Sequence, residues 1–167
     1  MYSKSHAGLT LLLMSVIMLP FPYGDNSLII ILLSTMLSTL PDIDLKWQRS
    51  GLPVHHRGFT HSVLFAFISG LAFGALFWYT NNTLTWVGLG FFSGFIGVVS
   101  HMIGDTLTYM PFKPLWPFDK REISFGLCSA GDKVVNEGLM SVGSGAFILY
   151  VLIKNGVVSD LLASFVL

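Results

Sequence analysis

The sequence contains little charge and almost no cysteine. Only 11% of its 167 residues are Asp, Glu, Lys or Arg, whereas about 25% is usual in a soluble domain. Hydrophobic residues make up 53%, and the formal net charge is zero, so no excess of basic charge is available for nucleic acid. The single cysteine, Cys128, excludes an internal disulfide and a CxxC motif. We therefore expect an integral membrane protein that has no nucleic-acid partner.

The N-terminal apolar run, residues 9–19, follows Lys4 and could be mistaken for a signal peptide. No small-residue cleavage site follows it. The run ends instead in Pro20-Phe21-Pro22-Tyr23, which is too bulky for such a site. We expect this segment to stay in the mature protein.

Apolar stretches between polar or Pro/Gly breaks predict the helices. They cover residues 5–22, 27–41, 62–80, 86–105 and 138–154, and an apolar tail follows at 156–167. A bilayer core needs roughly 20 helical residues, so the third and fourth stretches can span it, while the first two could form a shallow hairpin. The tail contains Asp160 and is expected at the interface. The prediction is one all-α membrane domain over residues 1–167, a bundle of about five transmembrane or membrane-inserted helices.

Two other features shape this bundle. Gly70/Gly74 and Gly90/Gly94 repeat at four-residue spacing, which lets helices approach closely in lipid. Residues 109–136 carry Pro111, Pro114 and Pro117 among aromatic side chains and predict a long non-helical loop. Its aromatics are expected at the headgroup level and could cover a site as a lid.

The basic residues predict the orientation. The loops 22–27 and 80–85 contain no Lys or Arg. Of the nine basic residues, Lys154 alone is expected on the same side of the membrane as these two loops. The other eight share the opposite side: Lys4, Lys46, Arg49, Arg57, Lys113, Lys120, Arg121 and Lys133. The positive-inside rule then predicts a multi-pass protein of the inner (cytoplasmic) membrane with a cytoplasmic N-terminus.

All five histidines fall at the same predicted cytoplasmic face, together with three aspartates. Four separate helix ends supply these residues, so folding can gather them. They are His6 before the first stretch, Asp42 and Asp44 after the second, His55, His56 and His61 before the third, and His101 and Asp105 at the end of the fourth.

Spacing sharpens the pattern. His101 and Asp105 are i and i+4 on one helix face, which suits two ligands of one metal as well as a simple intrahelical hydrogen bond. Asp42 and Asp44 would point the same way if the backbone there is extended, although such a pair is often a solvated turn. Thr60 is expected to cap the third helix. An aspartate at membrane depth costs on the order of 3 kcal/mol, which a shared metal would offset.

The motifs together resemble a known family. They are His6, Pro41-Asp42-Ile43-Asp44, His56-Arg57-Gly58-Phe59-Thr60-His61-Ser62, Ser100-His101-Met102-Ile103-Gly104-Asp105 and Trp116-Pro117-Phe118. This set resembles the LexA-regulated, membrane-bound metal-dependent hydrolase family of bacteria and archaea. The resemblance implies metal ligands at His6, Asp42, Asp44, His61, His101 and Asp105. It casts His56 and Arg57, on a loop expected to be exposed, as groups that contact substrate or support the ligands.

The predicted function is metal-dependent hydrolysis at the cytoplasmic membrane face, on a phosphoester or other ester of a lipid or amphiphile. Six candidate ligands exceed the four of a tetrahedral zinc, so one or two divalent ions are expected, zinc first and manganese second. Asp42 or Asp44 would accept the proton of the attacking water. Two alternatives are a metal or proton transporter, which should carry polar groups along its spans, and a non-catalytic membrane scaffold.

Overall fold

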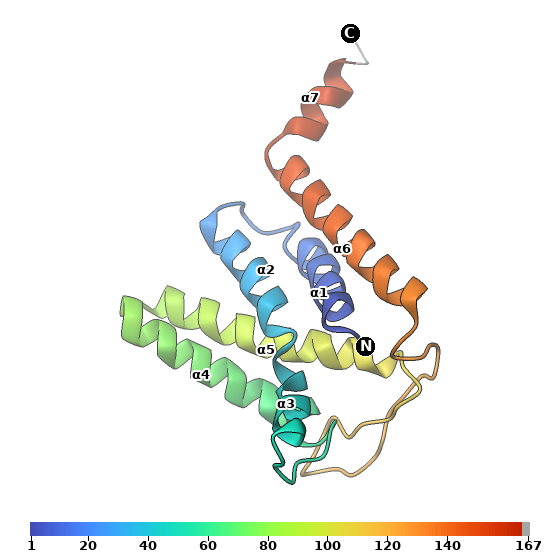
Figure 1. Ribbon diagram of the computed structural model, residues 1–167. Coiled ribbons are helices and arrows are strands. Elements are labelled where there is room, and N and C mark those ends of the chain that lie inside the picture. Colours follow the sequence, from blue (N-terminus) through green and yellow to red (C-terminus); the bar gives the residue numbers. More distant parts are fainter. Residues whose placement is uncertain (165–167) are drawn as a thin grey trace.

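The computed structural model describes residues 1–164, and no strand occurs among them (Figure 1). Residues 165–167 of the predicted tail lie outside the described residues. The predicted all-α class is confirmed. The elements are α1 (Ser3–Ile17), α2 (Asp25–Leu37), the 3₁₀ turn η1 (Leu40–Asp42), α3 (Ile43–Arg49), the 3₁₀ turn η2 (Phe59–His61), α4 (Val63–Asn81), α5 (Leu84–Thr106), α6 (Lys133–Lys154) and α7 (Val157–Ser164).

Four helical stretches are long and apolar enough to cross a membrane: Asp25–Arg49, α4, α5 and α6. The first of these is longer than predicted because η1 and α3 continue the course of α2. Helix α1 has 15 residues and spans only about 22 Å at 1.5 Å per residue, which is less than the roughly 30 Å of a hydrocarbon core. The first predicted segment is therefore the short one.

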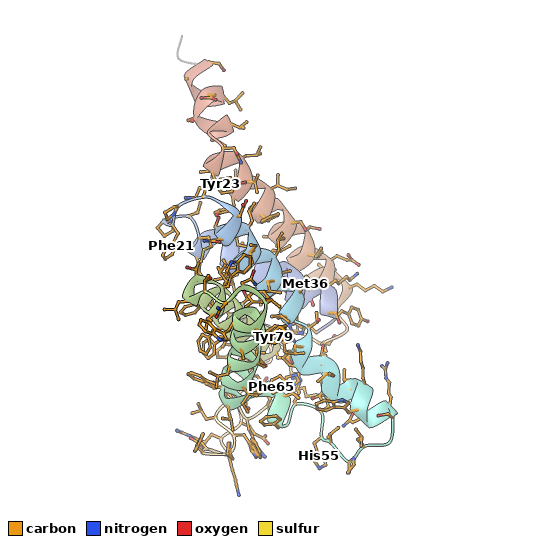
Figure 2. All side chains as sticks on the ribbon, turned by 90° about the vertical axis from the view of Figure 1, so that its left-hand side faces the viewer. Phe21, Tyr23, Met36, His55, Phe65 and Tyr79 are labelled. Atoms are coloured by element: carbon orange, nitrogen blue, oxygen red, sulfur yellow. The ribbon has the colours of Figure 1, made fainter. Side chains whose placement is uncertain are left out.

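The outer surface of the bundle carries large apolar side chains. Met36 is 71% exposed and Tyr79 88% exposed, and Phe21 and Tyr23 are exposed in the turn between α1 and α2, at the end far from His55 (Figure 2). A water-soluble protein does not leave so much contiguous apolar surface uncovered. This surface is suited to contact with lipid.

Side-chain caps mark the start of α4, α5 and α6. Ser62, not Thr60 as predicted, caps α4, because its backbone is extended and its Oγ accepts a hydrogen bond from the Phe65 amide. His61 consequently lies in η2, outside the helix. Asp132 caps α6 in the same way. This helix therefore begins at Lys133, five residues before the predicted apolar stretch 138–154.

Glycines allow the closest helix contacts, as predicted. A methyl group at Gly90 would collide with the Phe73 carbonyl, and one at Gly94 would meet the Ser69 carbonyl at 2.8 Å. The hairpin of α4 and α5 is therefore packed backbone against backbone. Gly143 of α6 lies equally close to the backbone of Gly8, which joins α6 to α1.

Helix α5 is the centre of the arrangement. It contacts α1 and α2 as well as α4, so the start of α1, the end of α2, the start of α4 and the end of α5 meet at one end of the bundle (Figure 1). The long loop of residues 107–132 returns across this end. The Val63 amide donates to the Pro114 carbonyl, and the Leu127 amide donates to the Leu107 carbonyl.

The orientation of the bundle can be tested with single cysteines. In a Cys128→Ser background, cysteines at Gln48 and Asp119 are expected to react only with thiol reagents that reach the cytoplasm. One at Asn82, in the turn between α4 and α5, should react with an impermeant reagent added outside whole cells. Labelling of Gln48 and Asn82 from the same side would contradict the predicted topology.

Candidate metal centre

Seven candidate side chains meet where the ends of the helices converge. Their potential ligand atoms form three groups, and within each group these atoms all lie within 4.8 Å of one another. His61 and His101 each belong to two groups, so the three groups are one continuous cluster. The groups are His6, His101 and Asp105; Asp42, His61 and His101; and Asp44, His56 and His61. The imidazoles of His6, His61 and His101 are completely buried.

His61 and His101 lie at the centre of the cluster. Their Nε2 atoms are 3.1 Å apart. Asp105 Oδ2 lies 3.4 Å from His61 Nε2 and 3.6 Å from His101 Nε2, and Asp42 Oδ1 lies 3.9 and 3.7 Å from the same two atoms. Donors at about 2.0–2.1 Å from a tetrahedral zinc are themselves about 3.3 Å apart. These four atoms are therefore close enough to share one ion.

The hydrogen bond of His101 determines its tautomer. Its Nδ1 lies 2.6 Å from the carbonyl oxygen of Ser38, which can only accept. Nδ1 therefore carries the proton, and Nε2 presents a lone pair to the cluster. An outer hydrogen bond of this kind is what orients a metal-ligating histidine.

His61 is held in the same tautomer. Thr60 Oγ1 donates to Asp44 Oδ2 at 2.8 Å, so at 3.0 Å it can only accept a hydrogen bond from His61 Nδ1. Burial opposes protonation of His61, but Asp105 and Asp44 outweigh this effect and raise its pKa above the ordinary value. This environment favours positive charge at His61 Nε2.

Two neutral imidazoles that both present lone pairs cannot hydrogen-bond to each other. At a separation of 3.1 Å, the Nε2 atoms of His61 and His101 need a cation between them. A shared proton or a metal ion meets this need. The carboxylate oxygens of Asp42 and Asp105 surround the same position and favour a divalent charge there.

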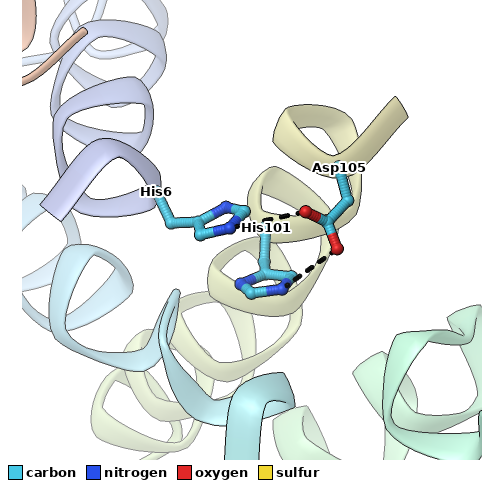
Figure 3. Close-up of side chains that lie close together, drawn as sticks. All are labelled: His6, His101 and Asp105. Carbon is cyan, nitrogen blue, oxygen red and sulfur yellow. Dashed lines mark ion pairs between the residues drawn. The ribbon is translucent and has the colours of Figure 1, made fainter. Parts of the chain in front are cut away.

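His6 adds a third imidazole from α1 (Figure 3). Its ring stacks on His101 with centroids 3.7 Å apart, and its Nε2 lies 3.5 Å from Asp105 Oδ1. Neither of its ring nitrogens has a hydrogen-bond partner among the described residues. Gly104 makes room for the ring, because a methyl group there would meet His6 Nδ1 at 2.9 Å. An imidazole buried without partners is costly unless it binds something.

The backbone at Asp42 and Asp44 differs from the prediction. It is helical, not extended, since η1 runs directly into α3. Asp42 still faces His61 and His101, while Asp44 faces the next loop. Asp44 Oδ1 lies 2.9 Å from His56 Nδ1, and Asp44 Oδ2 accepts from the Arg57 amide and the Thr60 hydroxyl. Because both oxygens are engaged in this way, Asp44 orients His61 and the loop around it.

Arg57 is buried, although its loop was expected to be exposed. Its Nη2 lies 2.8 Å from Asp105 Oδ1, and its Nη1 donates to the Thr108 hydroxyl and the Met110 carbonyl. The amino group of Met1 also lies 3.2 Å from Asp105 Oδ1. The two oxygens of Asp105 therefore face different groups, with Oδ1 toward Arg57 and Oδ2 toward His61 and His101.

A family model describes this chain over residues 1–165. The chain belongs to the YdjM inner membrane protein family. This membership agrees with the membrane protein predicted from the apolar stretches and says nothing about hydrolysis or LexA regulation. No curated protein and no solved structure matches the chain.

The cluster of this YdjM-family protein borders two cavities, one at Asp42 and one at Asp44. The Asp42 side chain is 18% exposed, whereas those of Asp44 and Asp105 are 2% exposed. Asp42 lines a cavity of about 340 Å³ between the start of α1 and α3. A second cavity, of about 280 Å³, lies beside Asp44 and is lined by Trp47, Phe59 and Trp116.

The loop of residues 107–132 covers the other side of the cluster. Phe112 is buried with its ring centroid 6.3 Å from that of His61, and Trp116 packs edge-on against Phe59. Phe118 and Phe125 are instead 86% and 70% exposed. The loop thus supplies both a cover and apolar side chains for the interface.

Three groups in the site have no signal that marks them in the sequence. They are the Ser38 carbonyl, the Thr60 hydroxyl that links Asp44 to His61, and the Thr108 hydroxyl that holds Arg57. A carbonyl is present at every residue. Serine and threonine are too common in these helices to stand out.

Proposed function

We propose that this protein is a metal-dependent hydrolase whose site lies at the cytoplasmic membrane face. The observation that carries the proposal is the pair of Nε2 lone pairs of His61 and His101, 3.1 Å apart and flanked by carboxylate oxygens of Asp42 and Asp105. Imidazole nitrogen with carboxylate oxygen is the donor set of catalytic zinc and manganese sites. The resemblance of the motifs to membrane-bound metal-dependent hydrolases supports the same chemistry.

The donor set favours one principal ion. Oδ2 of Asp105 is open to it, whereas Oδ1 already faces Arg57. A second ion beside His6 would have to displace both the Arg57 guanidinium and the Met1 amino group from that oxygen. Zinc is the first candidate and manganese the second, and His6 completes the inner wall of the site.

A bound divalent ion would lower the pKa of water to about 7 and polarise the substrate oxygen. Asp42 Oδ1 faces the two histidines, so the other carboxylate oxygen of Asp42, which borders the cavity, is the one suited to accept the proton of that water. Asp44 is held by His56 and Thr60. For a phosphoester, the water oxygen forms a bond to phosphorus. The ester oxygen leaves as an alcohol, with a proton from solvent.

The position of the site favours an amphiphilic substrate. The cavity at Asp42 is lined by Ser3 and Lys46, at the end of the bundle that the basic residues assign to the cytoplasmic headgroup region. A lipid or another amphiphile with a phosphoester reaches this depth without leaving the membrane.

Metal content and turnover test the proposal. The purified protein is expected to contain a divalent metal by plasma mass spectrometry, and Asp105→Ala should lose it because the side chain faces both histidines. The matched control is Asp119→Ala, which removes an exposed carboxylate paired with Arg121. Hydrolysis of a phosphoester amphiphile in detergent should stop with chelator and return with zinc or manganese. Absence of metal from the parent protein, or full metal in both variants, would refute the proposal.

A metal or proton transporter is the second candidate, favoured by polar atoms inside the bundle. The hydroxyls of Ser15, Ser34, Ser93 and Tyr150 are buried in four helices and have no protein partner among residues 1–164. Such groups could line a path through the membrane. Metal or proton flux in proteoliposomes, with no turnover in a broad screen of esters and amides, would favour transport. A protein with neither activity would be a scaffold.

A further inference from the structure

The cavity at Asp42 has basic groups that the proposed chemistry does not use. Lys46 and Arg49 of α3 line it, four and seven residues after Asp42, the residue that precedes this helix, so all three lie on one side of the helical stretch. Both basic side chains are exposed, and neither takes part in an ion pair within residues 1–164, whereas Lys4 and Lys113 each have a glutamate partner. Their charge is available to a ligand.

The rest of the lining is mixed. Leu40, Ile43 and Leu45 supply apolar wall, and Ser3 and Thr39 supply hydroxyls. Asp42 is the sole acid of the lining, and its Oδ1 faces the two histidines. Asp42 therefore connects the cavity lined by Lys46 and Arg49 to the candidate metal position.

We propose that this cavity is the substrate port, and that Lys46 and Arg49 bind the phosphate of an anionic headgroup. Arginine and lysine form charge-assisted hydrogen bonds with phosphate, and the arginine can do so with two parallel bonds. The apolar wall suits the glycerol and the first methylenes of a lipid. This inference rests on the proposed function, since it names the residues that bind the substrate's phosphate at the same site. It moves substrate binding from the buried Arg57 to two residues on α3.

Lipid binding by the full protein tests the port. The protein is placed in phosphatidylcholine nanodiscs that contain a minor fraction of phosphatidic acid, and bound phosphatidic acid is measured by native mass spectrometry. Lys46→Gln/Arg49→Gln is expected to reduce this binding at least about tenfold, because charge-assisted bonds are roughly twice as strong as neutral ones. The control Lys120→Gln/Arg121→Gln removes the same charges from the exposed part of the 107–132 loop and should stay within about twofold of the parent.

Further arms separate the possible outcomes. Calorimetry with glycerol 3-phosphate shows whether a soluble phosphate ester binds; loss of that binding only in the Lys46/Arg49 variant would support the phosphate site with a soluble source. Equal losses in both double variants would mean general attraction to surface charge and would overturn the port. Metal content is measured on every sample. If the parent protein contains no metal and its lipid binding still depends on Lys46 and Arg49, the proposed hydrolase function is refuted and the substrate port is supported.

Discussion

His101→Asn is expected to remove the bound metal while leaving the bundle folded. Asparagine Nδ2 can take the place of His101 Nδ1 and donate to the Ser38 carbonyl, so the outer hydrogen bond is kept. The Nε2 ligand, which lies 3.1 Å from His61 Nε2, is lost. The fall in metal affinity should exceed the roughly 10–100-fold that loss of an outer partner costs. Competition with a chromogenic chelator measures the affinity, and circular dichroism measures the fold.

The control for this variant is His55→Asn, which changes an exposed histidine outside the three candidate ligand groups. It should retain the metal affinity of the parent. If His101→Asn binds metal as tightly as the parent, the two Nε2 atoms share a proton and the metal assignment is wrong. If His101→Asn lowers the helicity, His61→Asn is tested in its place, since His61 Nε2 belongs to the same candidate metal position.

Much of the bundle can be read from the sequence because the bilayer imposes long apolar stretches. The five predicted segments correspond to α1, α2, α4, α5 and α6. The pairing of His101 with Asp105 was predictable because helix periodicity places residues i and i+4 on one face. In the structure, His101 Nε2 lies 3.6 Å from Asp105 Oδ2. Hydropathy and periodicity are local properties, which is why these features were predictable.

The backbone around Pro41 was not predictable from the same signals. Proline lacks an amide hydrogen and so cannot donate to Leu37, which ends α2 there. Proline is tolerated in a first turn, and the chain begins η1 and α3 at once, without an extended stretch. The break also leaves the Ser38 carbonyl free to accept from His101. The choice between a new turn and an extended strand depends on these tertiary contacts.

The burial of Arg57 also depends on tertiary contacts. A loop with two histidines and an arginine is typical of an exposed cytoplasmic segment. Here its partners, Thr108 and Met110, come from beyond α5, 51 and 53 residues away. The backbone of Arg57 has φ 61°, a conformation that non-glycine residues rarely adopt. The contacts with Asp44 and Asp105 hold it there.

Arg57→Ala is expected to lower the free energy of unfolding by about 3–5 kcal/mol, because it leaves Asp105 as a buried charge without its guanidinium partner. Arg57→Gly should be less destabilised than Arg57→Ala by about 1 kcal/mol, since glycine adopts a positive φ without the steric cost of a Cβ atom. Unfolding in detergent, followed by circular dichroism during denaturant titration, measures both values on metal-free protein.

A double variant separates the ion pair from simple loss of packing. Adding Asp105→Asn to Arg57→Ala removes the buried charge that has lost its guanidinium partner, so the double variant should be more stable than Arg57→Ala alone. Arg121→Ala, which breaks the exposed pair with Asp119, is the matched arginine control and should change stability by less than about 1 kcal/mol. If Asp105→Asn only adds to the loss caused by Arg57→Ala, the guanidinium does not neutralise Asp105. A second metal ion beside His6 would then have to compete for Oδ1 with the Met1 amino group.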